Sequence, residues 1–280
     1  MNSNLDISIV IAFYNQAKMT IGCVKSIYNY GPNVKEILLV SNNSSPRELE
    51  LVQTYAATTP STRVLVWDYP FNYQKEYNWA VSKTTGKYVF MLNNDIELRP
   101  KSRGLIERMY EKASHPNVGI VGCTLLYGDE KQIQHAGVYL VPEGLADHMY
   151  VREKYSEAIS STASDRFPYD ITKDMPMTAV TGAAQMVEKR KFDELGGLDE
   201  KFIICGGDVD LCIRHNSAGY QTWLIGGGYM LHKESVSRKF TPIPDEDFYN
   251  SYLSYIKGYD LRVGDPFVPE ITKNLKIYGA

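Results

Sequence analysis

Asn93, Asn94 and Asp95 follow an apolar stretch directly, and their side chains can bind ligands that the stretch itself cannot. Residues 88–92 read YVFML, a run typical of a strand buried on both faces of a parallel sheet. Open α/β sheets bind ligands at the carboxyl ends of their strands. Carboxylate oxygens are ligands that hard divalent cations favour. The sequence therefore predicts a cation at Asp95, at the edge of a sheet.

Two further predicted strands also end in polar residues, at 12–15 (AFYN) and 41–45 (SNNSS). Neither end carries a G-x-G-x-x-G fingerprint or a P-loop, so a helix N-terminus of the usual dinucleotide type is not available for a phosphate. A cation held by a carboxylate is the other common way to neutralise a diphosphate. This favours Asp95 as the residue that holds it.

Each candidate residue also has a purely structural interpretation. Asp95 can close an Asx-turn or cap a helix that begins near Pro100. Asp208 and Asp210 open a predicted helix, where acids interact favourably with the helix dipole. His232 follows apolar residues, and a single histidine there is more often a hydrogen-bonded core residue than a ligand.

The predicted elements alternate between strand and helix over the first hundred residues. Apolar runs predict strands, and amphipathic patterns between them predict helices. The strands lie at 7–13, 36–40, 63–67 and 88–92, and the helices at 17–28, 46–57 and 73–83. This order is typical of a doubly wound α/β unit with a mainly parallel sheet.

The pattern changes after residue 98. The expected elements are a helix at 101–114, strands at 119–122 and 178–187, helices at 189–195 and 208–218, and a long loop at 151–175. Four aromatic residues then recur at helical spacing, which predicts a packing face. They are Phe248, Tyr252, Tyr255 and Tyr259.

Composition narrows the classes of function. The 280 residues are 44% hydrophobic with a net charge of -3, which indicates a globular protein and does not favour nucleic acid as a partner. The four cysteines lack metal-binding or C-x-x-C spacing, as suits a reducing compartment. The N-terminus has no signal-like segment, and no apolar run reaches about 20 residues. We expect a cytoplasmic protein and leave peripheral contact with the inner face of the membrane, and the oligomeric state, open.

Several segments in this order resemble the family 2 glycosyltransferases of the GT-A fold. They include ISIVIAFYN, ILLVSNNSS, the long segment ending in FMLNNDIEL, VTGAAQMVEKRKFDELGGLDEKF, GGDVDLCIRHNSAGY and LHKESVSR. The resemblance extends from Asp6 to Lys239 and is strongest to the branch of bacterial polysaccharide and O-antigen synthesis. It implies an α/β fold of GT-A type, a Rossmann-like, mainly parallel sheet flanked by helices in a single catalytic domain.

The resemblance also implies roles for individual residues. Asp95 would coordinate Mn2+ or Mg2+ on the donor's phosphates, and His232 would complete the metal site. Asp208 would be the general base, and Asn93 would lie near the donor ribose. The full set implied to contact the donor is Ala12, Tyr14, Asn42, Lys75, Asn78, Asn93, Asn94 and Arg238.

Two positions depart from the family pattern. Asn42 stands where an acid usually reads the nucleobase, which leaves the base open because an amide can both donate and accept. Gly207 replaces the first acid of the usual acidic pair. His135 and His148 are candidates for the acceptor side, while Lys75 and Asn78 can equally well face solvent.

We therefore expect a catalytic domain at 1–240, with a donor half at 1–98 and an acceptor half at 99–240, and a helical, Tyr-rich tail at 241–280. The predicted function is metal-dependent, inverting transfer of a sugar to a hydroxyl acceptor in cell-surface glycan synthesis. A UDP- or dTDP-sugar is the favoured donor, and a glycan or lipid-linked glycan is the expected acceptor. The alternatives are a nucleotide-sugar-binding protein without turnover and a nucleotidyltransferase.

Overall fold

Four apolar segments of the first hundred residues form neighbouring parallel strands of one large sheet, as their composition predicts. The computed structural model describes residues 4–141, 146–160, 169–233, 242–259 and 265–268. The strands of the large sheet are β1 (Leu5–Phe13), β2 (Val34–Asn42), β3 (Thr62–Trp67), β4 (Tyr88–Leu92), β5 (Ile96–Glu97), β6 (Val118–Tyr127), β7 (Ile133–His135), β10 (Met175–Met177), β11 (Ala184–Glu188) and β12 (Gln221–His232). A separate pair consists of β8 (Val138–Leu140) and β9 (Ala146–His148).

The ten-stranded sheet has the order β10-β12-β6-β11-β4-β1-β2-β3, with β5 beside β12 and β7 beside β6. Strand β1 pairs in parallel with β2 and β4, and β2 pairs in parallel with β3. Strand β11 runs antiparallel between β4 and β6, and it joins the two halves of the sheet. The predicted α/β fold with a largely parallel sheet is confirmed.

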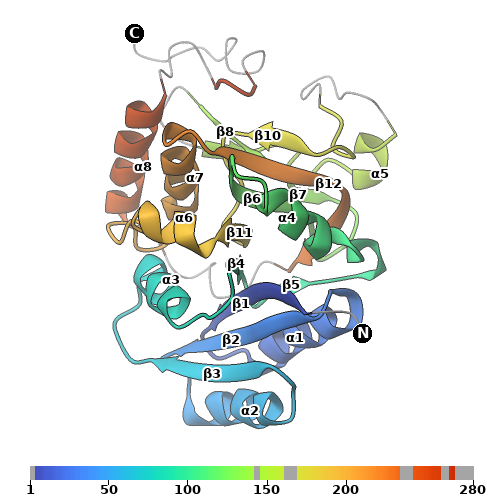
Figure 1. Ribbon diagram of the computed structural model, residues 1–280, viewed down its shortest axis with the longest axis vertical. Coiled ribbons are helices and arrows are strands. Elements are labelled where there is room, and N and C mark those ends of the chain that lie inside the picture. Colours follow the sequence, from blue (N-terminus) through green and yellow to red (C-terminus); the bar gives the residue numbers. More distant parts are fainter. Residues whose placement is uncertain (1–3, 142–145, 161–168, 234–241, 260–264, 269–280) are drawn as a thin grey trace.

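Helices cover both faces of this sheet (Figure 1). They are α1 (Ala17–Tyr30), α2 (Pro46–Ala57), α3 (Tyr73–Ser82), the 3-10 turn η1 (Pro100–Ser102), α4 (Leu105–Ala113), α5 (Tyr155–Ala158), α6 (Lys189–Glu194), α7 (Gly207–Ser217) and α8 (Asp245–Gly258). One buried cluster joins the sheet to α1, α2 and α4, and the other joins it to α3, α6 and α7. The result is a three-layer arrangement of helix, sheet and helix.

The expectations for the second half need four corrections. The helix expected at 101–114 is two elements, because Gly104 has a φ of 75° and interrupts it. The strand expected at 119–122 extends over the ten residues of β6. The strand expected at 178–187 is only β11, because residues before Ala184 leave the ladder. The loop expected at 151–175 contains the short helix α5, and residues 161–168 of it lie outside the described residues.

The aromatic stripe of the tail is not a single packing face. Tyr255 is buried, whereas Phe248 and Tyr252 are 44% and 45% exposed. The inner face of α8 instead carries Asp247 and Ser251 together with Tyr255. The helix does pack on the body of the protein, beside α7 (Figure 1).

Candidate active site

Asp95 and His232 lie side by side at the carboxyl ends of β4 and β12. The pairing of β5 with β12 places His232 opposite Ile96. Oδ1 of Asp95 lies 3.2 Å from Nε2 of His232, and the two residues are 3% and 5% exposed. Asn93 Nδ2 lies 3.5 Å from the same imidazole nitrogen. The sheet thus brings together the carboxylate and the imidazole that the family resemblance implies as a pair.

This pair fits a divalent cation that also binds a substrate. Across the described residues, no group of three or more His, Cys, Asp or Glu side chains could bind a metal alone. Mg2+ and similar ions are commonly held by one or two protein ligands, with waters and substrate phosphates completing the shell. Two neighbouring ligands of an octahedral ion, each at about 2.1 Å, lie about 3 Å apart. The 3.2 Å between Oδ1 of Asp95 and Nε2 of His232 matches that separation.

A short segment, Thr181–Ala183, connects Asn93 to the remaining candidate residues. Asn93 N donates to Ala183 O over 3.0 Å. Gly182 N donates to Oδ2 of Asp208 over 2.7 Å. The segment therefore fixes the position of the Asp208 carboxylate relative to the strand end that precedes Asp95.

Asp208 and Asp210 have different surroundings, although both lie in the first turn of α7. Asp210 is buried, pairs with Arg214 over 2.7 Å and accepts a hydrogen bond from Ser254 over 2.6 Å. Asp208 accepts only backbone N–H groups, those of Gly182 and Val209, among the contacts that the described residues make. It is partly exposed. Asp210 therefore has a structural role, and of the two carboxylates only that of Asp208 is partly accessible from outside.

Gln74 occupies the space beside Gly207. A Cβ atom at position 207 would lie 2.6 Å from Cδ of Gln74, closer than side-chain atoms normally approach. Gln74 is 1% exposed, and its Oε1 has no hydrogen-bond partner among the described residues. The buried side-chain amide of Gln74, on α3, thus fills the space that a side chain at position 207 would occupy.

His135 and His148 form a pair close to His232. Their Nδ1 atoms lie 2.8 Å apart, and Nε2 of His135 faces Thr181 N at 3.4 Å. His135 is fully buried, and this burial holds its pKa well below its usual value, with His148 and His232 contributing in the same direction. The neutral ring of His135 therefore supports Thr181, while His148 is partly exposed.

The donor candidates at β1 and β2 lie at one edge of the sheet. Ala12 N faces the hydroxyl of Tyr77 at 3.4 Å, and Tyr14 is 57% exposed. Asn42 is 4% exposed and donates from Nδ2 to Oε2 of Glu76 over 3.4 Å. Burial raises the pKa of Glu76 to about 8, and the hydrogen bond from Asn42 opposes this change.

The other predicted donor contacts lie at the end of β4, on α3 and in a later segment of the chain. Asn94 donates to the hydroxyl of Thr20 over 3.2 Å. Lys75 is exposed on α3. Asn78 uses its amide on Leu198 O, Leu198 N and the Glu200 carboxylate, so we assign it to the support of that loop rather than to the donor. Arg238 lies outside the described residues.

Helix α8 holds the backbone that leads into α7. Asp247 is fully buried, and its carboxylate accepts from the N–H groups of Ile203, Ile204 and Cys205 over 2.7, 2.8 and 3.0 Å. Gly206 follows with a φ of 89°, and a Cβ there would lie 2.3 Å from Oγ of Ser251. Asp247 could not be identified from the sequence, because three acids open α8 and nothing in the sequence separates the buried one from the others.

Glu76 and Gln74 were likewise not predicted as candidate residues from the sequence. The only signal in the sequence is that two polar residues stand two positions apart on a helix that must pack against the sheet. Both are nearly fully buried, and each has one oxygen without a hydrogen-bond partner among the described residues. Native proteins rarely leave such atoms unpaired, so each calls for an explanation.

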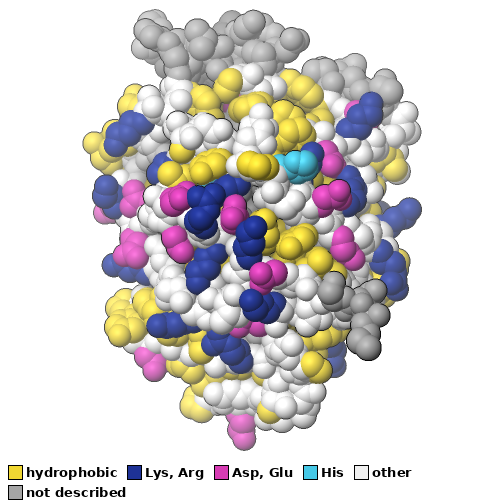
Figure 2. Space-filling model, in the orientation of Figure 1, with side chains coloured by type: hydrophobic (Ala, Val, Ile, Leu, Met, Phe, Trp, Pro, Cys, Tyr) yellow, Lys and Arg dark blue, Asp and Glu magenta, His cyan; other side chains and the backbone are white. Residues whose placement is uncertain are grey.

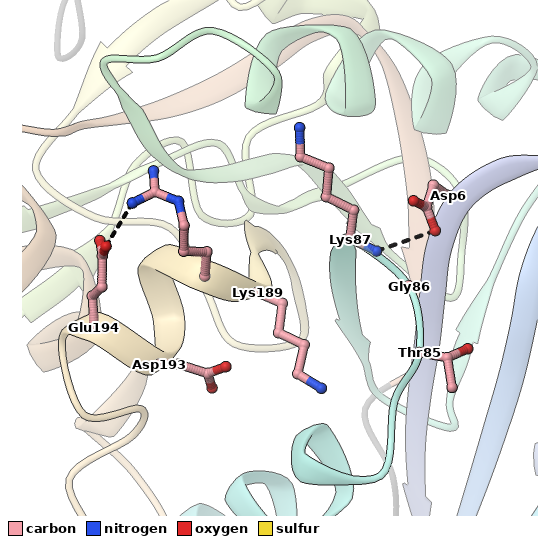
Figure 3. A pocket seen from close by; sticks show the side chains of 8 residues that line it. Asp6, Thr85, Gly86, Lys87, Lys189, Asp193 and Glu194 are labelled. Atoms are coloured by element: carbon pink, nitrogen blue, oxygen red, sulfur yellow. Dashed lines mark hydrogen bonds and ion pairs between the residues drawn. The ribbon is translucent and has the colours of Figure 1, made fainter.

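A separate pocket lies at the opposite end of the strands (Figure 3). It has a volume of about 680 Å³ and is lined by Asp6, Thr85, Gly86, Lys87, Lys189, Arg190, Asp193 and Glu194. Arg190 pairs with Glu194, and Lys189 donates to Thr84 O. Figure 2 shows Lys and Arg side chains mixed with Asp and Glu over the face in view. Because the pocket lies at the starts of β1 and β4, it is remote from the Asp95–His232 pair at the strand ends. Part of its charge is also paired.

Comparison with known proteins gives concordant results. The model of the glycosyl transferase family 2 matches residues 8–168. The O-antigen biosynthesis protein RfbC of Myxococcus xanthus is 36% identical over 240 residues, which are 85% of this chain and 18% of that protein. The chain thus spans about a fifth of the length of that relative.

Solved structures share the fold at low sequence identity. GalNAc-T7, solved with UDP, GalNAc and Mn2+, superposes with a TM-score of 0.63 and 16% identity, covering 83% of this chain and 44% of that one. The mannosyltransferase PcManGT of Pyrobaculum calidifontis, solved with GDP-Man and Mn2+, superposes with a TM-score of 0.59 and 14% sequence identity. The superposition covers 90% of this chain and 69% of that one. The predicted GT-A fold is confirmed by these likenesses. In the described part of the chain, no helix has both the length and the apolar character to cross a bilayer.

Proposed function

The chain belongs to glycosyl transferase family 2, and we propose that it transfers a sugar from a nucleotide-sugar donor to a hydroxyl group of an acceptor. One observation carries this proposal. The Asp95–His232 pair and the Asp208 carboxylate lie at one sheet edge, connected through Asn93 and the backbone of Thr181–Ala183. A cation ligand pair beside a partly exposed carboxylate is an arrangement that can stabilise the departing diphosphate and accept the proton of the attacking hydroxyl.

Asp95 and His232 would hold a divalent cation, Mn2+ or Mg2+, between them. When bound, such an ion neutralises the negative charge that grows on a departing diphosphate. The protein's part is to keep the two ligands in place. Two features hold the ligands in place: the pairing of β5 with β12, and the hydrogen bond that Lys233 N donates to Asp95 O over 3.1 Å. The two solved neighbours, each with Mn2+ and a nucleotide or nucleotide sugar, support this assignment.

Asp208 is the proposed general base. The acceptor hydroxyl loses its proton as its oxygen attacks the anomeric carbon, and a positioned carboxylate takes that proton. The N–H groups of Gly182 and Val209 hold the carboxylate in one orientation. A single displacement by the acceptor oxygen inverts the anomeric centre, so we propose an inverting transferase.

The donor is proposed to be a nucleoside diphosphate sugar, with UDP- and dTDP-sugars as first candidates. Ala12, Tyr14, Asn42, Asn93 and Asn94 would contact it from the strand ends. The likeness to an O-antigen biosynthesis protein supports a glycan or lipid-linked glycan as acceptor and a role in cell-surface polysaccharide synthesis.

The proposal is tested by incubating the chain with a panel of nucleotide sugars, with Mn2+ or with EDTA, and a panel of glycan acceptors. We expect one donor to be consumed only with a divalent cation and its product to have the opposite anomeric configuration by NMR. A protein that binds a nucleotide sugar tightly but neither transfers nor hydrolyses it would be a binding protein, and the proposed activity would be wrong.

A further inference from the structure

A chain of hydrogen bonds between side chains lies at the carboxyl end of β2 and fixes the amide of Asn42. Asn43 donates from Nδ2 to the backbone oxygen of Tyr69 over 3.2 Å. The same nitrogen donates to Oδ1 of Asn42 over 3.1 Å. Asn42 then donates from Nδ2 to Oε2 of Glu76 over 3.4 Å.

The direction of this chain is set at its outer end. The oxygen and nitrogen of an asparagine amide are distinguished only by their partners. A backbone carbonyl oxygen can only accept, so the atom of Asn43 that faces Tyr69 must be the nitrogen. That nitrogen also faces Asn42, whose oxygen must therefore point toward Asn43 and whose nitrogen must point toward Glu76.

Packing does not account for the carboxyl group of Glu76. The residue is 2% exposed, and its Oε1 has no hydrogen-bond partner among the described residues. Burying a carboxyl with an unsatisfied oxygen reduces the stability of the fold. A leucine of similar volume would fill the space without that loss, so a carboxyl here is explained better by what it does to Asn42.

Its effect on Asn42 is to hold the amide nitrogen inward. Oδ1 of Asn42 has two lone pairs, and Asn43 occupies one of them. Because Asn43 is exposed, the oxygen lies on the outer side of the Asn42 amide, at the ligand-binding edge of the sheet. Asn42, although an amide, is thereby restricted to accepting a hydrogen bond at that edge, as a carboxylate would be.

We propose that Glu76 is a positioning residue that makes Asn42 a hydrogen-bond acceptor for the donor's nucleobase, so that the chain selects a base with a ring N–H. Uracil, thymine and guanine carry such a group. Cytosine and adenine present a bare ring nitrogen at the equivalent edge. This inference rests on the proposed function, because that function requires a nucleotide ligand.

The burial of Asn42 makes the discrimination effective. The residue is 4% exposed, so a base bonded to its oxygen leaves little room for water beside it. Cytosine or adenine would place an acceptor nitrogen opposite the acceptor oxygen of Asn42, and neither atom would then have a hydrogen-bond partner. This loses more binding free energy inside the protein than the same mismatch would in water. A preference of about tenfold or more is the effect expected from one such mismatch.

The test is calorimetric titration of UDP, dTDP, GDP, CDP and ADP, with Mn2+, into wild type and three variants. Wild type should bind at least one of the first three about tenfold more tightly than CDP and ADP. Glu76→Leu removes the acceptor that holds Nδ2 of Asn42 inward and leaves only the hydrogen bond from Asn43 to orient the amide. This preference should therefore shrink, while the melting temperature stays equal or rises. Glu76→Gln keeps an acceptor for Asn42 and should retain the preference. Asn42→Asp should retain it too, since a carboxylate only accepts.

The outcomes separate this inference from the proposed function. Equal binding of all five nucleotides by wild type contradicts the inference alone, as does a Glu76→Leu variant that keeps the wild-type preference. A Glu76→Leu variant that weakens every nucleotide by the same factor would show a merely structural role and would also overturn it. If no nucleotide binds to wild type at all, the proposed function itself fails, and the inference fails with it.

Discussion

Replacing Asp247 by alanine should destabilise the chain strongly and slow transfer without weakening nucleotide binding. The carboxylate accepts three backbone hydrogen bonds, from Ile203, Ile204 and Cys205, and is fully buried. Hydrogen bonds to a charged group each contribute roughly 1.5 kcal/mol or more, and the N–H groups would lose their partner inside the protein. We therefore expect Asp247→Ala to lower the free energy of unfolding by about 4 kcal/mol. Asp247→Asn, which keeps one acceptor oxygen, should lose about half of that.

The assay is urea unfolding followed by tryptophan fluorescence, together with transfer rates at a temperature where the variant is folded. Asp245→Ala is the matched control, because Asp245 opens the same helix but is exposed, and its loss removes only the interaction with the helix dipole. The rate constant kcat should fall for Asp247→Ala, since the loop that it holds leads into Asp208, while nucleotide affinity is set at the strand ends. An unfolding free energy within about 1 kcal/mol of the control would show that the three hydrogen bonds to Asp247 contribute little to stability.

Three other variants test separate parts of the account. Asp208→Asn should reduce transfer by at least about a hundredfold and leave nucleotide affinity within about twofold, by calorimetry and product assay, whereas Asp193→Asn should change neither. His232→Ala should weaken Mn2+-dependent nucleotide binding by about tenfold or more, with the exposed His115→Ala as control; an unchanged Mn2+ dependence would leave His232 a core residue. Glu76→Gln should change the pH dependence of stability. Because the folded pKa of Glu76, about 8, lies above its usual 4.5, the folded state retains a proton that the unfolded state loses, and wild-type stability falls as pH rises between these values. Between pH 5 and pH 8 the unfolding free energy of Glu76→Gln, measured in urea, should therefore rise by on the order of 3 kcal/mol relative to that of wild type. If the unfolding free energies of the two proteins change in parallel with pH, Glu76 is not a buried neutral acid.

The parallel half of the sheet could be predicted because its signal is local. Strands buried on both faces are continuous apolar runs, and β1, β2 and β4 are close to that limit. The segment before β11 shows where this signal fails. Thr181 and Gly182 lie among apolar and small residues and look like strand, but their N–H groups serve His135 and Asp208 instead of a neighbouring strand.

The site was only partly predictable from the sequence. The ends of β1, β2 and β4 could be identified because parallel strands deliver their last residues to one edge. The contact between Asp95 and His232 depends on β12 returning beside β5, which no local pattern encodes, and the pairing came from the family resemblance. Asp247 and Glu76 were not predicted, because an acid's partner is set by tertiary packing and not by the helix that carries it.

Calorimetric titration of UDP, dTDP and GDP with and without Mn2+ shows whether Asp95 holds a cation for a nucleoside diphosphate. The measurement compares wild type with Asp95→Ala and with the exposed control Asp129→Ala. We expect one nucleotide to bind wild type and the control only with Mn2+, and Asp95→Ala to abolish this binding. Equal binding with and without Mn2+, or Mn2+-dependent binding that survives Asp95→Ala, would contradict it.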